Sequence, residues 1–324
     1  MKKIATITFL CIITGFAGYL IGSSQKKIDS TTKEKKFELR QGGFKFINPL
    51  LECVSEEGFQ SSEVVQMKHL TEKYIDSVKD DDSVFHISVY FRELNNGPWF
   101  GIGEQEKFSP ASLLKVPILI AYLKEAESDP SLLLQKVTTK KIDTLSPLIP
   151  PSFQAEVGKS YTIDDLLLRM IAYSDNVAKD SLLGFISGAP LNKVYQDLGI
   201  EIPGIRTRDD YMSVKSYASF FRILYNASYL NRNMSEKALE FLSQVEFKEG
   251  IVAGVPRDVV VSHKFGERGT ADSNTLQLHD CGIVYYPSNP YLLCVMTRGS
   301  DFEKLKEVIK TISATIYREI KKNK

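Results

Sequence analysis

The chain is poor in residues that build metal centres, and its charges nearly balance. Its 324 residues include 4 histidines and 4 cysteines, and no cysteine pair has the spacing of a zinc site. Basic residues number 41 and acidic residues 40, which gives a formal net charge of +1. No basic patch interleaved with aromatic residues is visible. We therefore expect no metal, no other cofactor and no nucleic-acid partner.

The cysteines do not define a disulfide framework. Cys11 lies in an apolar run near the N-terminus, whereas Cys53, Cys281 and Cys294 lie in the part of the chain expected to be globular. One disulfide is compatible with an oxidising compartment, and Cys53 with Cys281 is the pair considered first. Buried free thiols are the alternative.

The N-terminus differs in composition from the rest. Two lysines precede an uncharged apolar run from Ile4 to Gly22, which is long enough to span a bilayer. Residues 1–22 are therefore expected to be a signal peptide or a membrane anchor, and the lack of a small-x-small cleavage site favours the anchor. Residues 23–44 begin with a polar, lysine-rich tract without apolar periodicity and are expected to be a flexible linker. The remaining residues, 45–324, suffice for one large domain.

Strand patterns lie at both ends of this domain, with helical patterns between them. Apolar and polar residues alternate from Phe85 to Phe91, which predicts a strand with one buried face, and Asn95-Asn96-Gly97 predicts a hairpin turn. Further strands are expected over 258–266, 276–286 and 291–298. Helices are expected over 61–76, 111–126, 162–171, 177–186, 213–225, 235–245 and 301–320.

This element order predicts an α+β fold. The simplest arrangement is one antiparallel sheet built from both chain ends and covered by the first and last helices. An all-helical subdomain, residues 113–246 approximately, is then inserted into it. Binding sites favour the seam between two such parts.

Three short peptides occur in a fixed order: Ser112-Leu113-Leu114-Lys115, Ser174-Asp175-Asn176 and Lys264-Phe265-Gly266. Together they resemble the active-site triplet of the penicillin-recognising serine enzymes, which are the class A β-lactamases and their D,D-peptidase relatives. None is specific alone, since Ser-x-x-Lys also occurs in the polar tract after residue 22. The resemblance implies a β-lactamase/transpeptidase-like fold over nearly all of the domain.

The first peptide places a hydroxyl beside an amine. Ser112 falls at the expected N-terminus of an apolar helix, where free backbone N–H groups and the helix dipole would stabilise an oxyanion. Lys115 projects from the same face three residues later. A serine needs a neighbour that takes its proton, and a lysine buried beside other cations can do so. A capping serine and a solvated lysine are the alternative, which the apolar neighbours of Lys115 disfavour.

The second peptide falls between two expected helices. A helix cap is the simplest interpretation of such a polar turn. The resemblance implies that Ser174 relays a proton towards the leaving nitrogen, that Asn176 holds the substrate amide and that Asp175 braces the turn.

The third peptide follows a run of valines near the end of an expected strand. By resemblance, Lys264 lies opposite the nucleophile and binds a substrate carboxylate, and the backbone N–H of Glu267 is the second oxyanion donor. Gly266 lets the strand approach a ligand closely. Phe265 departs from the family, which has Thr or Ser there to hold the substrate carboxylate. Arg268 or His263 is a candidate substitute.

A class A β-lactamase also needs a glutamate, in a Glu-x-x-Leu-Asn segment after Ser-Asp-Asn, to activate the deacylating water. The glutamate found between residues 174 and 235 is Glu201, whose surroundings do not match that segment. By resemblance, Asp209 or Asp210 braces this loop against Arg206 or Arg208. The triplet thus supports acylation more strongly than deacylation.

Three functional hypotheses follow. The first is a serine hydrolase acylated at Ser112 by β-lactams or acyl-D-Ala-D-Ala peptides, acting either as a β-lactamase or as a penicillin-binding D,D-peptidase with slow deacylation. The second is an esterase on the same scaffold, which Phe265 allows. The third is a non-catalytic envelope protein that binds peptidoglycan stem peptides, against which the presence of both Ser112 and Lys115 argues.

The resemblance also implies a place in the cell envelope. The lysines after the apolar run oppose export by the positive-inside rule, but long domains translocate largely regardless of charge. We therefore expect an exported protein, either secreted or held at the membrane by residues 1–22. We expect a monomer.

Overall fold

The computed structural model describes residues 38–53, 61–78, 82–95, 97–140, 147–204, 207–270 and 273–322. The expected signal peptide or anchor, residues 1–22, lies outside these ranges. The expected linker is described from Glu38, where strand β1 (Glu38–Arg40) pairs with β2 (Leu50–Cys53). Over the described part of the chain, no helix is both long and apolar enough to cross a membrane.

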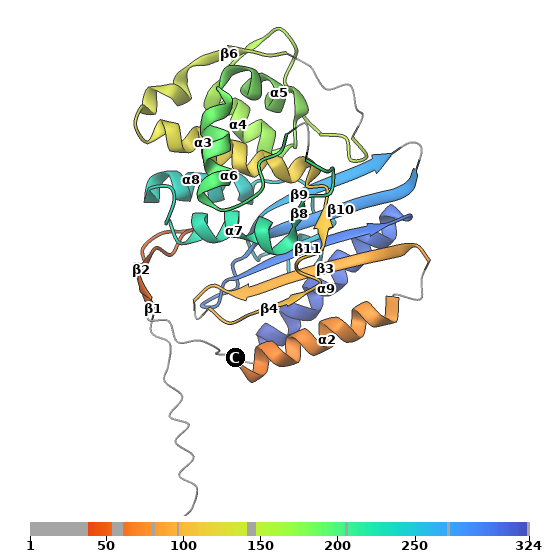
Figure 1. Ribbon diagram of the computed structural model, residues 1–324. Coiled ribbons are helices and arrows are strands. Elements are labelled where there is room, and N and C mark those ends of the chain that lie inside the picture. The colour runs from red at the N-terminus through yellow and green to blue at the C-terminus, as the bar shows by residue number, and fades with distance from the viewer. Residues whose placement is uncertain are drawn as a thin grey trace, which may run out of the picture. The chain divides into compact units, whose positions relative to one another are not determined.

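A five-stranded antiparallel sheet is the centre of the fold, with strand order β4-β3-β11-β10-β9. Its strands are β3 (Val84–Glu93), β4 (Trp99–Ile102), β9 (Val261–Thr270), β10 (Ser273–Val284) and β11 (Tyr291–Gly299). Two of them precede the helical block and three follow it, so the sheet is built from both chain ends (Figure 1). The expected α+β fold is confirmed.

Helices cover both faces of this sheet. Figure 1 shows two helices on one side, α2 (Ser62–Val78) and α9 (Phe302–Lys322). The helices between β4 and β9 lie on the other side. These are α3 (Lys115–Ala126), α4 (Ile163–Ala172), α5 (Asn176–Phe185), α6 (Gly188–Asp197), α7 (Val214–Tyr225) and α8 (Arg232–Ser243).

Shorter elements complete the helical part. The 3-10 turns are η1 (Ala111–Leu114), η2 (Pro130–Leu134) and η3 (Ile251–Gly254). Two small antiparallel pairs join β5 (Lys107–Phe108) to β8 (Met212–Ser213) and β6 (Lys136–Thr138) to β7 (Ser160–Thr162).

Strand β3 departs from the expectation of one buried face. Ser88, Val89, Tyr90 and Phe91 are all buried in succession. Only the first half of the strand, at Phe85, exposes a large apolar side chain. The reason is that β3 lies inside the sheet between two helical layers, so both of its faces are covered.

The disulfide pairing also differs from the one considered first. Cys281 is bonded to Cys294, not to Cys53. Cys281 and Cys294 occupy directly opposite positions on β10 and β11, whereas Cys53 belongs to the separate β1-β2 pair. Opposed residues on antiparallel neighbours come close enough to pair, and this register could not be known from spacing alone.

Candidate active site

Ser112 lies in the turn η1 rather than on the α-helix itself. This turn begins at Ala111 with a left-handed backbone (φ +47°), and Leu113 N–H donates to the Pro110 carbonyl at 2.9 Å. Ser112 stays half-buried, while the turn leads directly into α3. A non-glycine residue with positive φ is uncommon and often marks a functional site.

Lys115 is the first residue of α3 and lies beneath Ser112. Its Nζ is 3.0 Å from Ser112 Oγ, 2.9 Å from Ser174 Oγ, 2.6 Å from the Ser174 carbonyl oxygen and 2.8 Å from Asn176 Oδ1. The side chain is only 1% exposed. An ammonium group has three N–H donors, so it must share one among these four oxygens. A neutral amine would instead donate to two of them and accept a proton from a serine hydroxyl.

The Ser174-Asp175-Asn176 turn is held by its buried aspartate. Asp175 Oδ1 accepts from Val177 N–H at 2.8 Å and from Ala178 N–H at 3.3 Å, which caps α5. Its Oδ2 accepts from Ala155 N–H at 2.7 Å. Ser174 has a positive φ of +55°. The cap expected for this turn and the site geometry therefore coexist, since Asp175 fixes the direction in which Ser174 points.

Lys264 approaches Ser174 from strand β9. Its Nζ lies 3.1 Å from Ser174 Oγ and 3.1 Å from the Phe265 carbonyl oxygen. Burial, and after it the positive charge of Lys115, lower the pKa of Lys264 well below its ordinary value. The Nζ atoms of Lys115 and Lys264 therefore both bond the hydroxyl of Ser174.

Gly266 allows β9 to lie against the turn that carries Ser112. A Cβ at this position would lie 2.8 Å from the Pro110 carbonyl oxygen and 2.9 Å from Leu113 Cγ. The close approach is therefore made to the protein's own turn η1. It brings the β9 backbone next to the nucleophile.

The residue that departs from the family motif is packed away from solvent. The ring of Phe265 stacks on Phe247 with centroids 4.5 Å apart, and Lys264 Nζ lies 3.9 Å from the Phe265 centroid. One candidate for the missing hydroxyl, His263, is fully buried and bonds Asp280 through Nδ1 at 2.8 Å. Because side chains alternate along a strand, His263 and Lys264 leave β9 on opposite faces.

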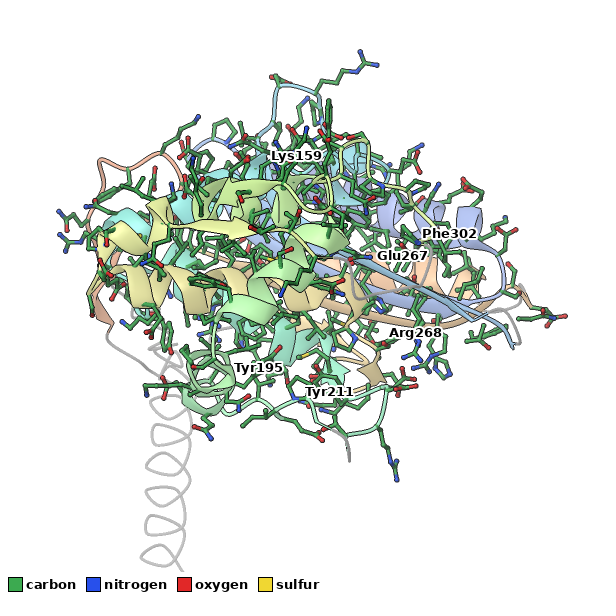
Figure 2. All side chains as sticks on the ribbon, turned by 90° about the horizontal axis from the view of Figure 1, so that it is seen from above. Lys159, Tyr195, Tyr211, Glu267, Arg268 and Phe302 are labelled. Carbon is green, nitrogen blue, oxygen red and sulfur yellow. A yellow bond between two sulfur atoms is a disulfide. The ribbon has the colours of Figure 1, made fainter. Side chains whose placement is uncertain are left out.

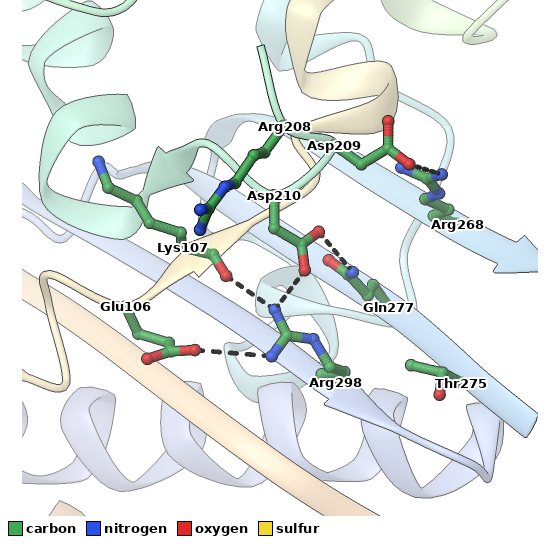
Figure 3. Close-up of a pocket in the computed structure, with 9 residues that line it drawn as sticks. All are labelled: Glu106, Lys107, Arg208, Asp209, Asp210, Arg268, Thr275, Gln277 and Arg298. Atoms are coloured by element: carbon green, nitrogen blue, oxygen red, sulfur yellow. Dashed lines mark hydrogen bonds and ion pairs between the residues drawn. The ribbon is translucent and has the colours of Figure 1, made fainter. Parts of the chain in front are cut away.

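The other candidate, Arg268, is already paired. Its guanidinium bonds Asp209 at 2.7 Å and Ser109 Oγ at 3.0 Å. It borders a charged cavity of about 570 Å³ (Figure 3). The cavity is lined by Glu106, Lys107, Arg208, Asp209, Asp210, Arg268, Thr275, Gln277 and Arg298.

Figure 3 also shows how the expected loop brace differs from the sequence prediction. Asp209 pairs with Arg268 of β9, and Asp210 pairs with Arg298 of β11 at 2.8 Å. Neither pairs with Arg208, and Arg206 lies outside the described residues. The two aspartates therefore tie the loop to the sheet instead of closing it upon itself.

Glu201 is not brought to this cluster. The residue is exposed in the loop after α6. Within the described residues, its carboxylate makes no hydrogen bond or ion pair with Ser112, Lys115 or Ser174.

Two functional contributions were not visible in the sequence. His279 holds the segment before the nucleophile, since its Nδ1 accepts from Thr297 N–H at 3.3 Å and its Nε2 therefore donates to the Ser109 carbonyl at 3.0 Å. Burial lowers the pKa of His279 to about 4, so the ring is neutral at physiological pH. No local motif identifies this residue, because its partners are more than ten positions away.

The second is the carboxylate of Glu267, a residue expected to act only through its backbone. It accepts from Leu148 N–H, with distances of 3.0 and 3.1 Å to its two oxygens. Burial raises the pKa of Glu267, whereas the hydrogen bonds to the loop and the charges of both lysines oppose that rise. Figure 2 labels Glu267 and Arg268, which are adjacent residues of β9 and therefore leave the strand on opposite faces.

The comparisons with known proteins agree with this geometry. Residues 70–320 match the sequence model described as the β-lactamase enzyme family. The extended-spectrum β-lactamase PER-1 of Pseudomonas aeruginosa is 26% identical over 239 residues, which cover 67% of this chain and 77% of that protein. The β-lactamase VEB-1 of the same organism is 23% identical over 269 residues, 78% of this chain and 89% of that protein.

Solved structures share the fold at low sequence identity. A PBP-A variant, solved as an acyl-enzyme complex with penicillin G, superposes with a TM-score of 0.67 at 22% identity, covering 79% of this chain and 97% of that one. The extended-spectrum β-lactamase TLA-1 gives 0.68 at 17% identity, covering 80% and 99%. The fold and the family matches define a β-lactamase-like serine hydrolase. With the family model matching most of its length, the chain belongs to the β-lactamase enzyme family.

Proposed function

We propose that Ser112 is acylated by β-lactams or by acyl-D-Ala-D-Ala peptides. The observation that carries this proposal is the position of Lys115 Nζ, 3.0 Å from Ser112 Oγ and 2.9 Å from Ser174 Oγ. Family membership supports β-lactams as substrates, as does the penicillin G acyl-enzyme of the PBP-A variant. One amine thus contacts both the nucleophile and the hydroxyl expected to serve the leaving group.

Acylation then follows a proton path through this amine. Neutral Lys115 accepts the Ser112 hydroxyl proton while Oγ attacks the substrate carbonyl. The resulting oxyanion is stabilised by the backbone N–H groups of Ser112 and Glu267. When the C–N bond breaks, the proton on Lys115 passes to Ser174 Oγ, whose own proton goes to the leaving nitrogen. The result is an ester on Ser112 and a protonated amine nitrogen, with Lys115 neutral again. A peptide substrate releases that amine as the terminal D-Ala, whereas a β-lactam ring opens and keeps the amine attached to the acyl group.

Substrate binding falls to polar groups around this path. Asn176 already accepts from Lys115 through Oδ1, so its amide nitrogen is the group available to a substrate carbonyl. Lys264 supplies positive charge next to Ser174 and would attract the substrate carboxylate. Phe265 has no hydroxyl to offer that carboxylate, and its ring packs on Phe247.

Deacylation is expected to be slow. Hydrolysis of the ester needs a base that activates water, and exposed Glu201 makes no contact with the catalytic groups described above. This favours a penicillin-binding enzyme with a persistent acyl-enzyme over an efficient β-lactamase.

Intact-mass measurement over time, after mixing the protein from Phe37 onwards with benzylpenicillin, tests both steps. We expect a single adduct with the mass of the intact drug that persists for many minutes and is absent in Ser112→Ala. A transient adduct with accumulating hydrolysed drug would retain the acylation step and overturn slow deacylation. No adduct and no hydrolysis would overturn the proposal and favour an esterase or a non-catalytic binder.

We further propose export to the cell envelope, with residues 1–22 as signal peptide or anchor. The support is the uncharged apolar run from Ile4 to Gly22. Protease added to intact spheroplasts should degrade the catalytic domain of a membrane-held protein, and protection equal to that of a cytoplasmic marker would contradict export.

A further inference from the structure

The segment 147–155 runs between the Ser-Asp-Asn turn and strand β9. At one end, Ala155 N–H donates to Asp175 of the Ser-Asp-Asn turn at 2.7 Å. At the other end, Leu148 N–H donates to Glu267 of β9 at 3.0 Å. Asp175 adjoins Ser174, and Glu267 adjoins Gly266, which touches the turn carrying Ser112. The segment therefore links the Ser-Asp-Asn turn to the part of β9 that lies against the turn carrying Ser112.

We propose that the Glu267 carboxylate is a positioning residue that holds residues 147–153 of this segment between β9 and the Ser-Asp-Asn turn and so selects which acyl groups reach Ser112. The selection of acyl groups rests on the proposed acylation of Ser112. The contact between Glu267 and residues 148–149 is independent of that function. The sequence resemblance assigned Glu267 a backbone role only, so the carboxylate is a separate functional group on the same residue.

The contact is built to hold backbone rather than side chain. Both carboxylate oxygens of Glu267 lie within 3.1 Å of Leu148 N, and one also accepts from Ile149 N–H at 3.4 Å. A carboxylate receiving successive backbone N–H groups resists displacement more than a side-chain contact between flexible groups does. The partners are 119 residues apart in the chain, so nothing but the fold brings them together.

Two further contacts limit the movement of the segment. Ser152 Oγ donates to the carboxylate of Glu246, which lies after α8. Phe153 packs on Tyr173, the residue before Ser174, with ring centroids 5.4 Å apart. With Asp175 and Glu267, these contacts fix the segment to the sheet edge, to the loop after α8 and to the Ser-Asp-Asn turn.

The segment exposes two large apolar side chains. Leu148 is 44% exposed and Phe153 is 61% exposed. Large apolar side chains held exposed near the polar groups of a binding site favour ligands that carry an apolar group. Segment 147–153 should therefore favour an acyl substituent with an aromatic ring over one without any side chain.

Two variants break the contact from opposite sides. Glu267→Gln replaces one acceptor oxygen with an amide nitrogen that cannot accept, and Leu148→Pro removes the donating N–H without touching β9. Glu303→Gln is the matched control, since it makes the same chemical change on an exposed site of α9. Should one variant fail to fold, the other still tests the contact.

The first measurement is hydrogen exchange in a peptide covering 147–153. In Glu267→Gln its amides should exchange at least tenfold faster than in the wild type, while peptides from α3 and the Glu303→Gln control stay unchanged. Wild-type exchange in Glu267→Gln would overturn the proposal, whatever the enzyme does to β-lactams.

The second is the ratio of acylation rate constants for benzylpenicillin and 6-aminopenicillanic acid, which lacks the phenylacetyl group. The ratio should fall at least fivefold in Glu267→Gln and in Leu148→Pro, with no further fall in the double variant. Equal loss for both drugs, or additive losses, would mean a merely structural role and overturn the selection. If neither drug acylates the wild type, the proposed function fails and the exchange result alone decides the contact.

Discussion

Lys115 Nζ lies 3.0 Å from Ser112 Oγ. Ser112 belongs to the short turn η1, and Lys115 is the first residue of the helix α3 that follows it. The spacing of three residues puts them on one face. Lys115 is buried, and its amine also bonds Ser174 and Asn176.

Replacing this lysine should stop acylation and leave the fold in place. Lys115→Ala is expected to slow acylation by benzylpenicillin by roughly 100- to 10000-fold, because this is what general-base assistance is worth. Lys115→Arg is the informative partner, since arginine keeps the charge and cannot act as a base. Intact mass gives the rate and circular dichroism the fold. Near-native acylation by either variant would exclude Lys115 as the base.

Removing the second lysine should stabilise the protein while harming catalysis. Burial lowers the pKa of Lys264, so the folded state disfavours its charge. The resulting loss of stability is complete below the lowered pKa, shrinks as the pH rises from there to 10.5 and is absent above 10.5. Lys264→Met should raise the free energy of unfolding by about 1 kcal/mol at pH 7, with a smaller gain at pH 10. Denaturant titration measures this.

The matched control is Lys193→Met on α6, where the side chain is 68% exposed and little change is expected. Acylation by Lys264→Met should meanwhile fall at least about tenfold, because charge beside Ser174 is lost. A destabilised Lys264→Met protein would show that its hydrogen bonds outweigh the cost of burying it.

A methyl group at Gly266 should push β9 away from η1. Its carbon would meet the Pro110 carbonyl oxygen at 2.8 Å, and a backbone atom cannot move aside cheaply. Gly266→Ala is expected to cost about 1 to 3 kcal/mol of stability and to slow acylation at least about tenfold. Gly188→Ala, where no atom lies within 4 Å of the added carbon, is the control for thermal melting and acylation. Equal melting temperatures and equal acylation rates in the two variants would contradict a steric clash at Gly266.

Acid should loosen the segment before the nucleophile through His279. Its pKa is lowered to about 4 from 6.5, so the stability that its neutral form provides is complete above pH 6.5 and is lost as the pH falls towards 4. The size of this loss is about 3 kcal/mol. Unfolding free energies of His279→Gln should fall less steeply over this interval than those of the wild type. The exposed His86→Gln should keep the wild-type slope, and equal slopes in all three would rule out His279 as the source.

Much of the fold follows from local patterns. Apolar periodicity located α2, α4, α5, α7 and α9 to within a few residues, and alternation located β3. Helix α6 was missed because it opens with Gly188 and Pro190, the two residue types of lowest helix propensity.

The sequence by itself determined that Ser112 and Lys115 share a face, because helical geometry relates residues three positions apart. The order of the three motifs then pointed to one family. Only the tertiary structure decided that Asp209 and Asp210 pair with the sheet, that Cys281 bonds Cys294 and that Glu267 holds Leu148. These contacts depend on sheet register and on how the helical part packs against β9, and a linear pattern carries no information about either.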